Sequence, residues 1–402
     1  MRRAATLGVL GIAAAGGFGL GVVLATGGQQ PVGAVSSTGP SAAPLSSLGS
    51  AGSPTSSASL APSSSPEPTA TPVPTPTTVP APLTGRLVLP QVAARHPIAV
   101  MIDDLGAARP QSGFSAASVV WQAPAEGGIP RYMLVFQENI PKAVGPVRSS
   151  RQYYIAWASE WKALYVHAGG SPQALASLRA NGRGQWVYNA DEFRWGHYFH
   201  RIRQRFAPHN LYTDGANLRR LANAAGARDI KAPKAAWKFG PAAPLARRPS
   251  GGRIQVTYPW NKITYRYDRA SNTYLRSVTG EIKQIDASTG ARVAPTNVVI
   301  MTMSFGPLND GSHKHRLEAN FIGKGTAWVS TNGRTIKGTW AKKSMTSPTR
   351  FYDRNGRQIV LTVGQTFVQV MPIGSRILIA DGKVPAPATT PSAMPSPMPQ
   401  PS

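Results

Sequence analysis

The sequence contains no cysteine among its 402 residues. This absence excludes disulfide bonds, thiolate metal sites, a cysteine nucleophile and a lipid-modified cysteine. A folded part without disulfides depends on its hydrophobic core for stability, and a chain of this length is long enough to form one.

Acidic residues are scarce as well. The chain has 17 Asp and Glu against 43 Lys and Arg, which gives a formal net charge of +26. Glu67 is the only charged residue between Arg3 and Arg86, so the positive charge belongs almost entirely to the chain from Arg86 onward. A charge of this size favours association with anionic molecules, although a general need for solubility explains it equally well.

The N-terminus has the pattern of an export signal. Arg2 and Arg3 precede an uncharged apolar run from Ala4 to Ala25, and we assign residues 1–26 to a signal peptide or signal anchor. The run is about as long as a membrane span, which favours a retained anchor. The segment Val32-Gly33-Ala34 resembles a cleavage site, and cleavage there would give a secreted protein instead.

Either fate of this segment places the rest of the chain outside the cytoplasm. We therefore expect a protein on the extracytoplasmic side of the cell membrane, which contacts the membrane through the apolar segment. The excess of basic residues then indicates an anionic cell-envelope polymer or a lipid headgroup as the partner, and not nucleic acid.

Two segments have the composition of disordered chain. Residues 27–84 consist almost entirely of Ser, Thr, Pro, Ala and Gly, and residues 384–402 have the same composition. Such segments cannot bury enough apolar surface to fold, and their prolines keep them extended. We predict a disordered linker and a disordered C-terminal tail.

The first folded block, residues 85–240, alternates strand-like and helix-like patterns. Apolar runs predict strands, and helical periodicity predicts helices, with Ser171 as an N-cap before Pro172. This alternation favours an α/β layered domain. The predicted strands are 97–102, 118–122, 132–136 and 163–167, and the predicted helices cover 151–162, 172–180 and 214–225.

The second block, residues 253–380, has no convincing helical window. Its runs at 256–258, 263–267 and 273–278 alternate apolar and polar residues, which is typical of strands. Asn332-Gly333 and Asn355-Gly356 are strong signals for tight hairpin turns. We predict an antiparallel β domain here, and an α+β architecture for the whole chain.

Except for Arg131, the candidate ligand-binding residues lie in glycine-rich segments that precede two predicted helices. Helix starts present free backbone N–H groups to anions, and α/β sheets bind ligands where strands end and helices begin. The alternative is structural: the serines cap helices, while Arg148 and Arg151 pair with Glu126, Asp103 or Asp104. The candidate anion site comprises Arg131, Arg148, Ser149, Arg151, Gly169, Gly170 and Ser171.

Candidates for acid–base chemistry are Asp103, Glu126, His167 and His209. Each histidine is either a general base or a hydrogen-bonded structural residue. The two carboxylates are possible metal ligands or bases. A zinc site built from His197, His200 and His209 lacks any established ligand spacing, so we assign no metal site. No Walker loop, dinucleotide fingerprint, nucleophile elbow or zincin helix is present, and we expect no cofactor.

Several short strings of the chain form a recognisable set: Pro97–Asp103, Ala108–Gly113, Glu126–Ile129, Arg131, Gly145–Ser149, Arg151, Tyr165–His167, Gly169–Pro172, Ala207–Tyr212 and Ser347–Asp353. Together they make the chain resemble the YerB-like lipoprotein family, whose function is unknown. The resemblance spans roughly Leu87 to Pro372 and implies a surface-exposed, membrane-tethered protein with no established reaction. Two departures are that the chain has no cysteine for a lipid anchor, which transfers tethering to the apolar run, and that Asp104 stands where Asn is more usual.

Three functions remain open at this level. The first is an envelope protein that binds an anionic wall or lipid-linked ligand through Arg148, Arg151 and the segment Gly169–Ser171. The second is a transferase or hydrolase for a pyrophosphate-linked glycopolymer, with Asp103 or Glu126 as metal ligand or base. The third is an extracytoplasmic scaffold that binds partner proteins at the edges of the β domain.

Overall fold

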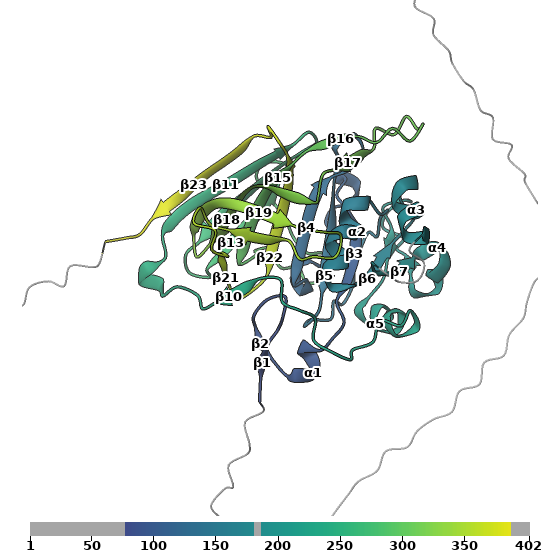
Figure 1. Ribbon diagram of the computed structural model, residues 1–402, viewed down its shortest axis with the longest axis horizontal. Helices are drawn as coiled ribbons and strands as arrows, with labels where there is room; N and C mark the ends of the chain where they lie inside the picture. The colour runs from purple at the N-terminus through teal and green to yellow at the C-terminus, as the bar shows by residue number, and fades with distance from the viewer. Residues whose placement is uncertain (1–76, 181–185, 387–402) are drawn as a thin grey trace, which may run out of the picture. The chain divides into compact units, whose positions relative to one another are not determined.

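The computed structural model describes residues 77–180 and 186–386 (Figure 1). The predicted signal or anchor, most of the predicted linker and the tail beyond residue 386 lie outside the described residues. None of the helices in the described part of the chain is long and apolar enough to cross a membrane.

A ten-stranded mixed sheet contains strands from both sequence blocks (Figure 1). Its order is β20-β19-β18-β15-β22-β4-β5-β3-β6-β7. The first block supplies β3 (Ile98–Asp103), β4 (Val119–Pro124), β5 (Pro130–Phe136), β6 (Leu164–His167) and β7 (Tyr188–Asp191). The second supplies β15 (Asn297–Met303), β18 (Gly323–Thr331), β19 (Arg334–Lys342), β20 (Arg350–Tyr352) and β22 (Thr366–Pro372).

Helices come almost entirely from the first block. The predicted helix at 151–162 is α2 (Gln152–Ala158) followed by a 3-10 turn (Ser159–Trp161), and Ser171 caps α3 as predicted, since its Oγ accepts from the Ala174 N–H. The remaining helices are α1 (Pro90–Ala93), α3 (Pro172–Ala180), α4 (Glu192–Trp195) and α5 (Gly215–Ala224). Further 3-10 turns are Gly106–Ala108, Phe114–Ala116, Glu126–Gly128, Gly196–Tyr198 and Leu245–Arg247.

A second, five-stranded sheet is antiparallel throughout, with the order β14-β13-β12-β11-β23. Its strands are β11 (Ser250–Tyr258), β12 (Asn261–Asp268), β13 (Thr273–Val278), β14 (Ile282–Lys283) and β23 (Ile377–Lys383). Small two-stranded sheets complete the fold. They pair β1 (Val79–Pro80) with β2 (Leu87–Val88), β8 (His200–Arg201) with β9 (Leu211–Tyr212), β10 (Lys238–Gly240) with β21 (Val360–Thr362), and β16 (Phe305–Pro307) with β17 (Leu317–Ala319).

Both faces of the ten-stranded sheet are buried. Alternate residues of β4 enter different cores: Trp121 packs on one face with α2, where it stacks on Trp157 with ring centroids 4.6 Å apart. Val120 packs on the other face, together with Leu218 of α5 and Tyr265 of the five-stranded sheet. Each core contains residues of both blocks, so the two blocks fold around shared cores.

Two predictions need correction. The second block is not wholly antiparallel, because β22 is parallel to both β15 and β4. Strands buried on both faces, as β22 is, suit parallel pairing. The predicted disordered linker is also too long at its C-terminal end, since Val79–Pro80 pairs with Leu87–Val88 and Leu83 is buried.

Candidate functional site

The predicted site residues meet at one edge of the ten-stranded sheet. Strands β3, β4, β6 and β7 run parallel, so their carboxyl ends lie along the same edge. The segment 147–151 crosses this edge, with the Arg148 N–H bonded to the Met101 carbonyl and Ser150 bridged to Gly170. Ligands of α/β sheets bind outside the carboxyl ends of strands, close to points where the strand order reverses.

Asp103, at the end of β3, binds two cationic or potentially cationic side chains. Its Oδ2 accepts from Arg148 Nε at 2.9 Å and from His209 Nδ1 at 2.7 Å, while Oδ1 accepts from the Leu105 N–H. Asp103 is buried, whereas the side chains of Arg148 and His209 are 23% and 18% exposed. Among the described residues, neither the terminal nitrogens of Arg148 nor Nε2 of His209 have a hydrogen-bond partner.

Glu126 forms the second ion-paired group of the edge. One oxygen binds Arg131 and the other binds Arg151, and both guanidinium groups are buried. Burial alone would raise the pKa of Glu126, but the two guanidiniums outweigh it and lower that pKa to about 2. Arg131 also donates to Ser149 Oγ at 3.1 Å, which connects this group to the segment that carries Arg148.

These contacts match the structural alternative for the arginines. Arg131 and Arg151 are held by Glu126, and Arg148 is held by Asp103. Because Arg131 and Arg151 are buried, they do not face solvent as ligand-binding groups, and Arg148 is the one arginine of the three with free, accessible nitrogens in the described chain.

The glycine-rich segment after β6 satisfies most of its own polar groups. The Gly169 N–H donates to Asp191, the Ser171 N–H donates to the Ser150 carbonyl, and Ser171 Oγ caps α3. Gly170 is bridged to Ser150. The segment therefore positions residues 147–151, and in the described chain the Gly170 N–H is the one backbone donor of Gly169, Gly170 and Ser171 without a hydrogen-bond partner.

The four acid–base candidates have different environments. His167 is fully buried, and its Nδ1 and Nε2 lie 2.8 Å from the Gly169 carbonyl and from Asn189 Oδ1, so it has no nitrogen available for a substrate. His209 has one nitrogen on Asp103 and the other available. Asp103 and Glu126 are both occupied by cationic partners, which leaves neither free to hold a metal.

His197, His200 and His209, considered above as zinc ligands, do not come together in the described part of the chain. In the described ranges, no three His, Asp or Glu side chains are grouped closely enough to hold a metal ion. His209 binds Asp103, and His197 packs on Tyr198 with ring centroids 4.0 Å apart.

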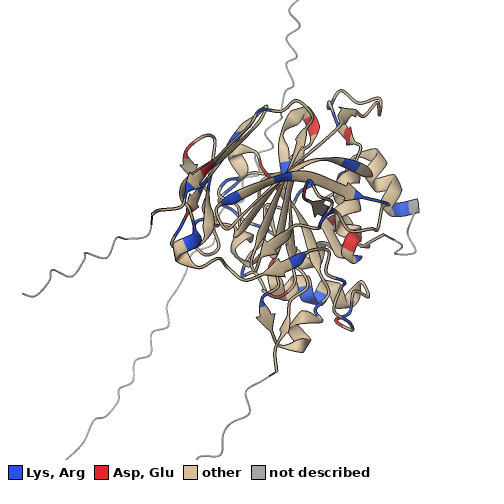
Figure 2. Ribbon diagram, turned by 60° about the vertical axis from the view of Figure 1, so that its left-hand side comes forward, with Lys and Arg blue, Asp and Glu red and all other residues tan. Residues whose placement is uncertain are grey.

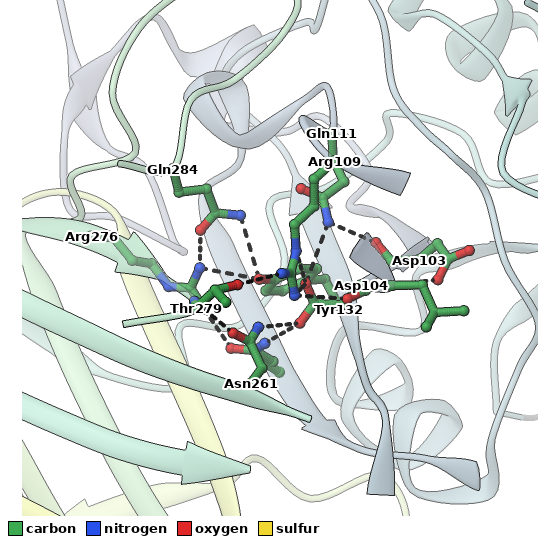
Figure 3. Close-up of polar contacts among 11 residues, drawn as sticks. Asp103, Asp104, Arg109, Gln111, Tyr132, Asn261, Arg276, Thr279 and Gln284 are labelled. Carbon is green, nitrogen blue, oxygen red and sulfur yellow. Dashed lines mark hydrogen bonds and ion pairs between the residues drawn. The ribbon is translucent and has the colours of Figure 1, made fainter. Parts of the chain in front are cut away.

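Sequence reasoning missed a second buried polar cluster, centred on Asp104 (Figure 3). Asp104 pairs with Arg109 at 2.8 Å and accepts from Gln122 at 2.6 Å, and burial raises its pKa against the opposing effect of Arg109 and Arg276. Arg276 of β13 is fully buried and donates to Gln122 Oε1 at 2.6 Å, as well as to neutral oxygens of Tyr132, Tyr265 and Gln284.

One sequence signal for this cluster was available. Tyr274, Arg276 and Val278 share the inward phase of β13, and an arginine among inward apolar positions indicates a buried charge with partners. Outside the buried clusters, Figure 2 shows Lys and Arg spread over both sheets and the loops, with Asp and Glu much sparser.

Comparisons with known proteins agree with this architecture. Residues 83–228 match the family model "Protein of unknown function (DUF3048) N-terminal domain", and residues 254–368 match the corresponding C-terminal domain. The chain is 31% identical over 305 residues to "Putative lipoprotein YerB" of Bacillus subtilis (strain 168), covering 72% of this chain and 85% of that protein. A crystal structure of the YerB protein from Bacillus subtilis aligns with a TM-score of 0.66 and 26% identity, covering 75% of this chain and 99% of the other. The chain therefore belongs to the YerB-like family of proteins of unknown function, in agreement with its sequence motifs.

Proposed function

We propose that this protein is an envelope protein that binds an anionic ligand at the carboxyl edge of the ten-stranded sheet, through Arg148 and His209. The observation that carries the proposal is their shared partner. Asp103 fixes Nε of Arg148 and Nδ1 of His209, so the terminal N–H groups of Arg148 and Nε2 of His209, which is a donor in the imidazolium form, are oriented and partly exposed. A pre-oriented guanidinium beside an imidazole suits the oxygens of a phosphate or carboxylate.

The local charge favours an anion as well. Three guanidiniums, those of Arg131, Arg148 and Arg151, face two carboxylates, those of Asp103 and Glu126, which leaves one positive charge before His209 is counted. An envelope location is supported by the lipoprotein name of the Bacillus subtilis relative and by the apolar N-terminal run, which replaces the missing lipid-anchor cysteine. In that location the anion comes from a wall polymer or from a lipid headgroup.

Binding is tested by isothermal titration calorimetry of the protein from residue 77 onward. The first probe is a soluble poly(glycerol phosphate), and the second is vesicles of phosphatidylglycerol in phosphatidylcholine, so the two arms distinguish wall polymer from headgroup. Arg148→Ala should weaken binding about tenfold, the loss typical of one charge-assisted contact. Arg266→Ala removes an equally charged but remote side chain, 52% exposed, and should leave binding nearly unchanged. Equal losses in the two variants, or no binding to either probe, would reject the proposal.

A hydrolase or transferase acting on a pyrophosphate-linked glycopolymer is the second candidate. It is favoured by the Asp103–His209 contact, because a carboxylate on Nδ1 orients an imidazole whose Nε2 can accept a proton. In this reaction Nε2 takes the proton of an attacking water or hydroxyl, whose oxygen forms a new bond to one phosphorus. The bridging P–O bond of the pyrophosphate breaks, and the other phosphate leaves with its electron pair. Release of phosphate product from a synthetic lipid-pyrophosphate sugar, abolished by His209→Gln, would establish it. If this substrate is unchanged after prolonged incubation, the catalytic function is rejected and only the binding function remains.

A further inference from the structure

A cavity separate from the carboxyl-edge site lies where the two sequence blocks meet. Its volume is about 410 Å³, which is within the usual range for ligand pockets. One wall is the loop Gly106–Gln111 of the first block, and the other is the hairpin from Val278 to Ile285 of the second. The loop touches the hairpin at both ends: Arg109 donates to Thr279 Oγ1 at 3.0 Å (Figure 3), and the Gln111 carbonyl accepts from the Ala287 N–H at 2.9 Å.

The hairpin wall is a free strand edge. Strand β14 is the last strand of the five-stranded sheet, and among the described strands it pairs only with β13. The Gln284 N–H donates to the Arg276 carbonyl, and hydrogen-bonded and non-hydrogen-bonded pairs alternate along an antiparallel ladder. The Lys283–Ser277 pair is therefore a non-hydrogen-bonded pair, so the N–H and C=O of Lys283 point away from β13. Neither has a partner among the described residues, and Lys283 lines the cavity.

The side chains around the cavity combine an apolar surface with unused polar groups. Pro110, Val278 and Ile285 line it, and Ile282, whose surface is 63% exposed, borders it. Gln111 is fully buried, and its Oε1 has no hydrogen-bond partner, although its amide nitrogen is bonded to the Asp103 carbonyl. An unpaired buried acceptor beside the cavity is costly.

These observations define the chemistry of the occupant. The outward N–H and C=O of Lys283 match the alternating donors and acceptors of an extended peptide backbone. The apolar walls accept an aliphatic side chain, and the ammonium group of Lys283 favours an acidic residue beside it. We propose that an extended peptide segment of a partner protein, with an aliphatic residue flanked by acidic residues, adds to the edge of β14 in this cavity. The proposal is independent of the anion site.

The test uses fluorescence polarisation of a labelled, end-blocked peptide, Glu-Val-Glu-Val-Glu, with the protein from residue 77 onward. Lys283→Pro removes the outward N–H but no ladder bond, and proline is tolerated at such edge positions. Lys283→Ala removes the charge and keeps the N–H. Binding should fall by about tenfold in Lys283→Pro, as expected for loss of a main-chain hydrogen bond, and by less in Lys283→Ala. Circular dichroism confirms that both variants fold.

A second arm keeps the protein unchanged. The same peptide with both valines N-methylated cannot donate its valine N–H groups, and it should bind at least about tenfold more weakly. Equal affinity of the two peptides, equal loss in the two Lys283 variants, or no binding of the parent peptide at millimolar concentration would overturn the proposal. Binding of decanoate without binding of the peptide would also overturn it, by assigning the cavity to a small amphipathic anion.

Discussion

Asp103 and Asp104 are adjacent in the chain, yet their carboxylates serve two separate clusters. Asp103 binds Arg148 and His209 at the carboxyl edge of the ten-stranded sheet, while Asp104 binds Arg109, which lines the cavity between the loop Gly106–Gln111 and the hairpin Val278–Ile285. Successive residues of an extended chain point to opposite faces, so the end of β3 supplies one carboxylate to each face. The proposed anion site depends on Asp103, whereas the proposed peptide-binding cavity is next to the partner of Asp104. Different substitutions therefore test the two sites.

The first prediction concerns Asp103→Asn. If net charge alone governed binding, removing a carboxylate from the edge would strengthen the binding of poly(glycerol phosphate). We expect a loss of about tenfold instead, because an asparagine in place of Asp103 no longer holds Arg148 and His209 by charge-assisted bonds. Calorimetry also checks the double variant Asp103→Asn with Arg148→Ala, whose loss should be smaller than the product of the two single losses, because both substitutions act on Arg148. A gain of affinity in Asp103→Asn would contradict the orienting role of this carboxylate.

The second prediction is the pH dependence of the Glu126 group. The folded pKa of Glu126 is lowered to about 2 from an ordinary value of 4.5. Its ionised form therefore stabilises the fold above about pH 4.5, and this contribution is lost as the pH falls from 4.5 towards 2. The difference in unfolding free energy between the parent protein and Glu126→Gln should be about 2 kcal/mol at pH 7, allowing for partial exposure.

The same comparison at lower pH provides the control. Urea unfolding at intervals between pH 7 and pH 3 should show a constant difference above pH 5 and a shrinking one below it. Because other carboxylates titrate in both proteins, only the difference between the two reports on Glu126. A difference that grows as the pH falls would contradict the assignment of Arg131 and Arg151 as its partners.

Local patterns predicted the elements that surround the site. Both faces of the ten-stranded sheet are covered, so a strand inside it needs apolar residues on both sides. This requirement appears in the sequence as the mostly apolar runs of β3, β4, β5 and β6. The Ser171-Pro172 pair marked the start of α3, and Asn332-Gly333 marked the turn between β18 and β19. Each of these signals comes from residues that are neighbours in sequence.

Pairings between distant segments were not predictable in this way. Strand β22 lies beside β4, nearly 250 residues earlier in the chain, and nothing in either strand specifies the other. The sequence offered Asp103 as one partner for Arg148, but it gave no reason to place His209, from a remote loop, on the same carboxylate. Arg276 was missed because its partners come from four separate strands or loops.

The third prediction concerns the Glu160–Lys342 ion pair, which joins the end of α2 to β19. Lys342 Nζ lies 3.1 Å from Glu160 Oε1, and both side chains are fully buried. Lys342→Met would leave a carboxylate buried without its counter-charge, and it should lower the unfolding free energy by about 3 kcal/mol. Adding Glu160→Gln should recover most of this loss. A double variant as unstable as the sum of the single variants would show that the two side chains are not coupled.

The fourth prediction compares two turn glycines with nearly the same backbone. Gly333 has φ +73° and Gly356 has φ +75°, so alanine at either position incurs the cost of a left-handed conformation, about 1 kcal/mol. A Cβ at Gly356 would meet nothing within 4 Å, whereas a Cβ at Gly333 would lie 2.4 Å from Tyr267 Cε1 and 2.6 Å from Pro249 Cγ. The Tyr267 ring is buried in the shared core and cannot move aside easily. Gly333→Ala should therefore lower the unfolding free energy by about 3 kcal/mol in total, against about 1 kcal/mol for Gly356→Ala. Equal urea midpoints for the two variants would mean that Tyr267 does not pack against the β18–β19 turn in solution.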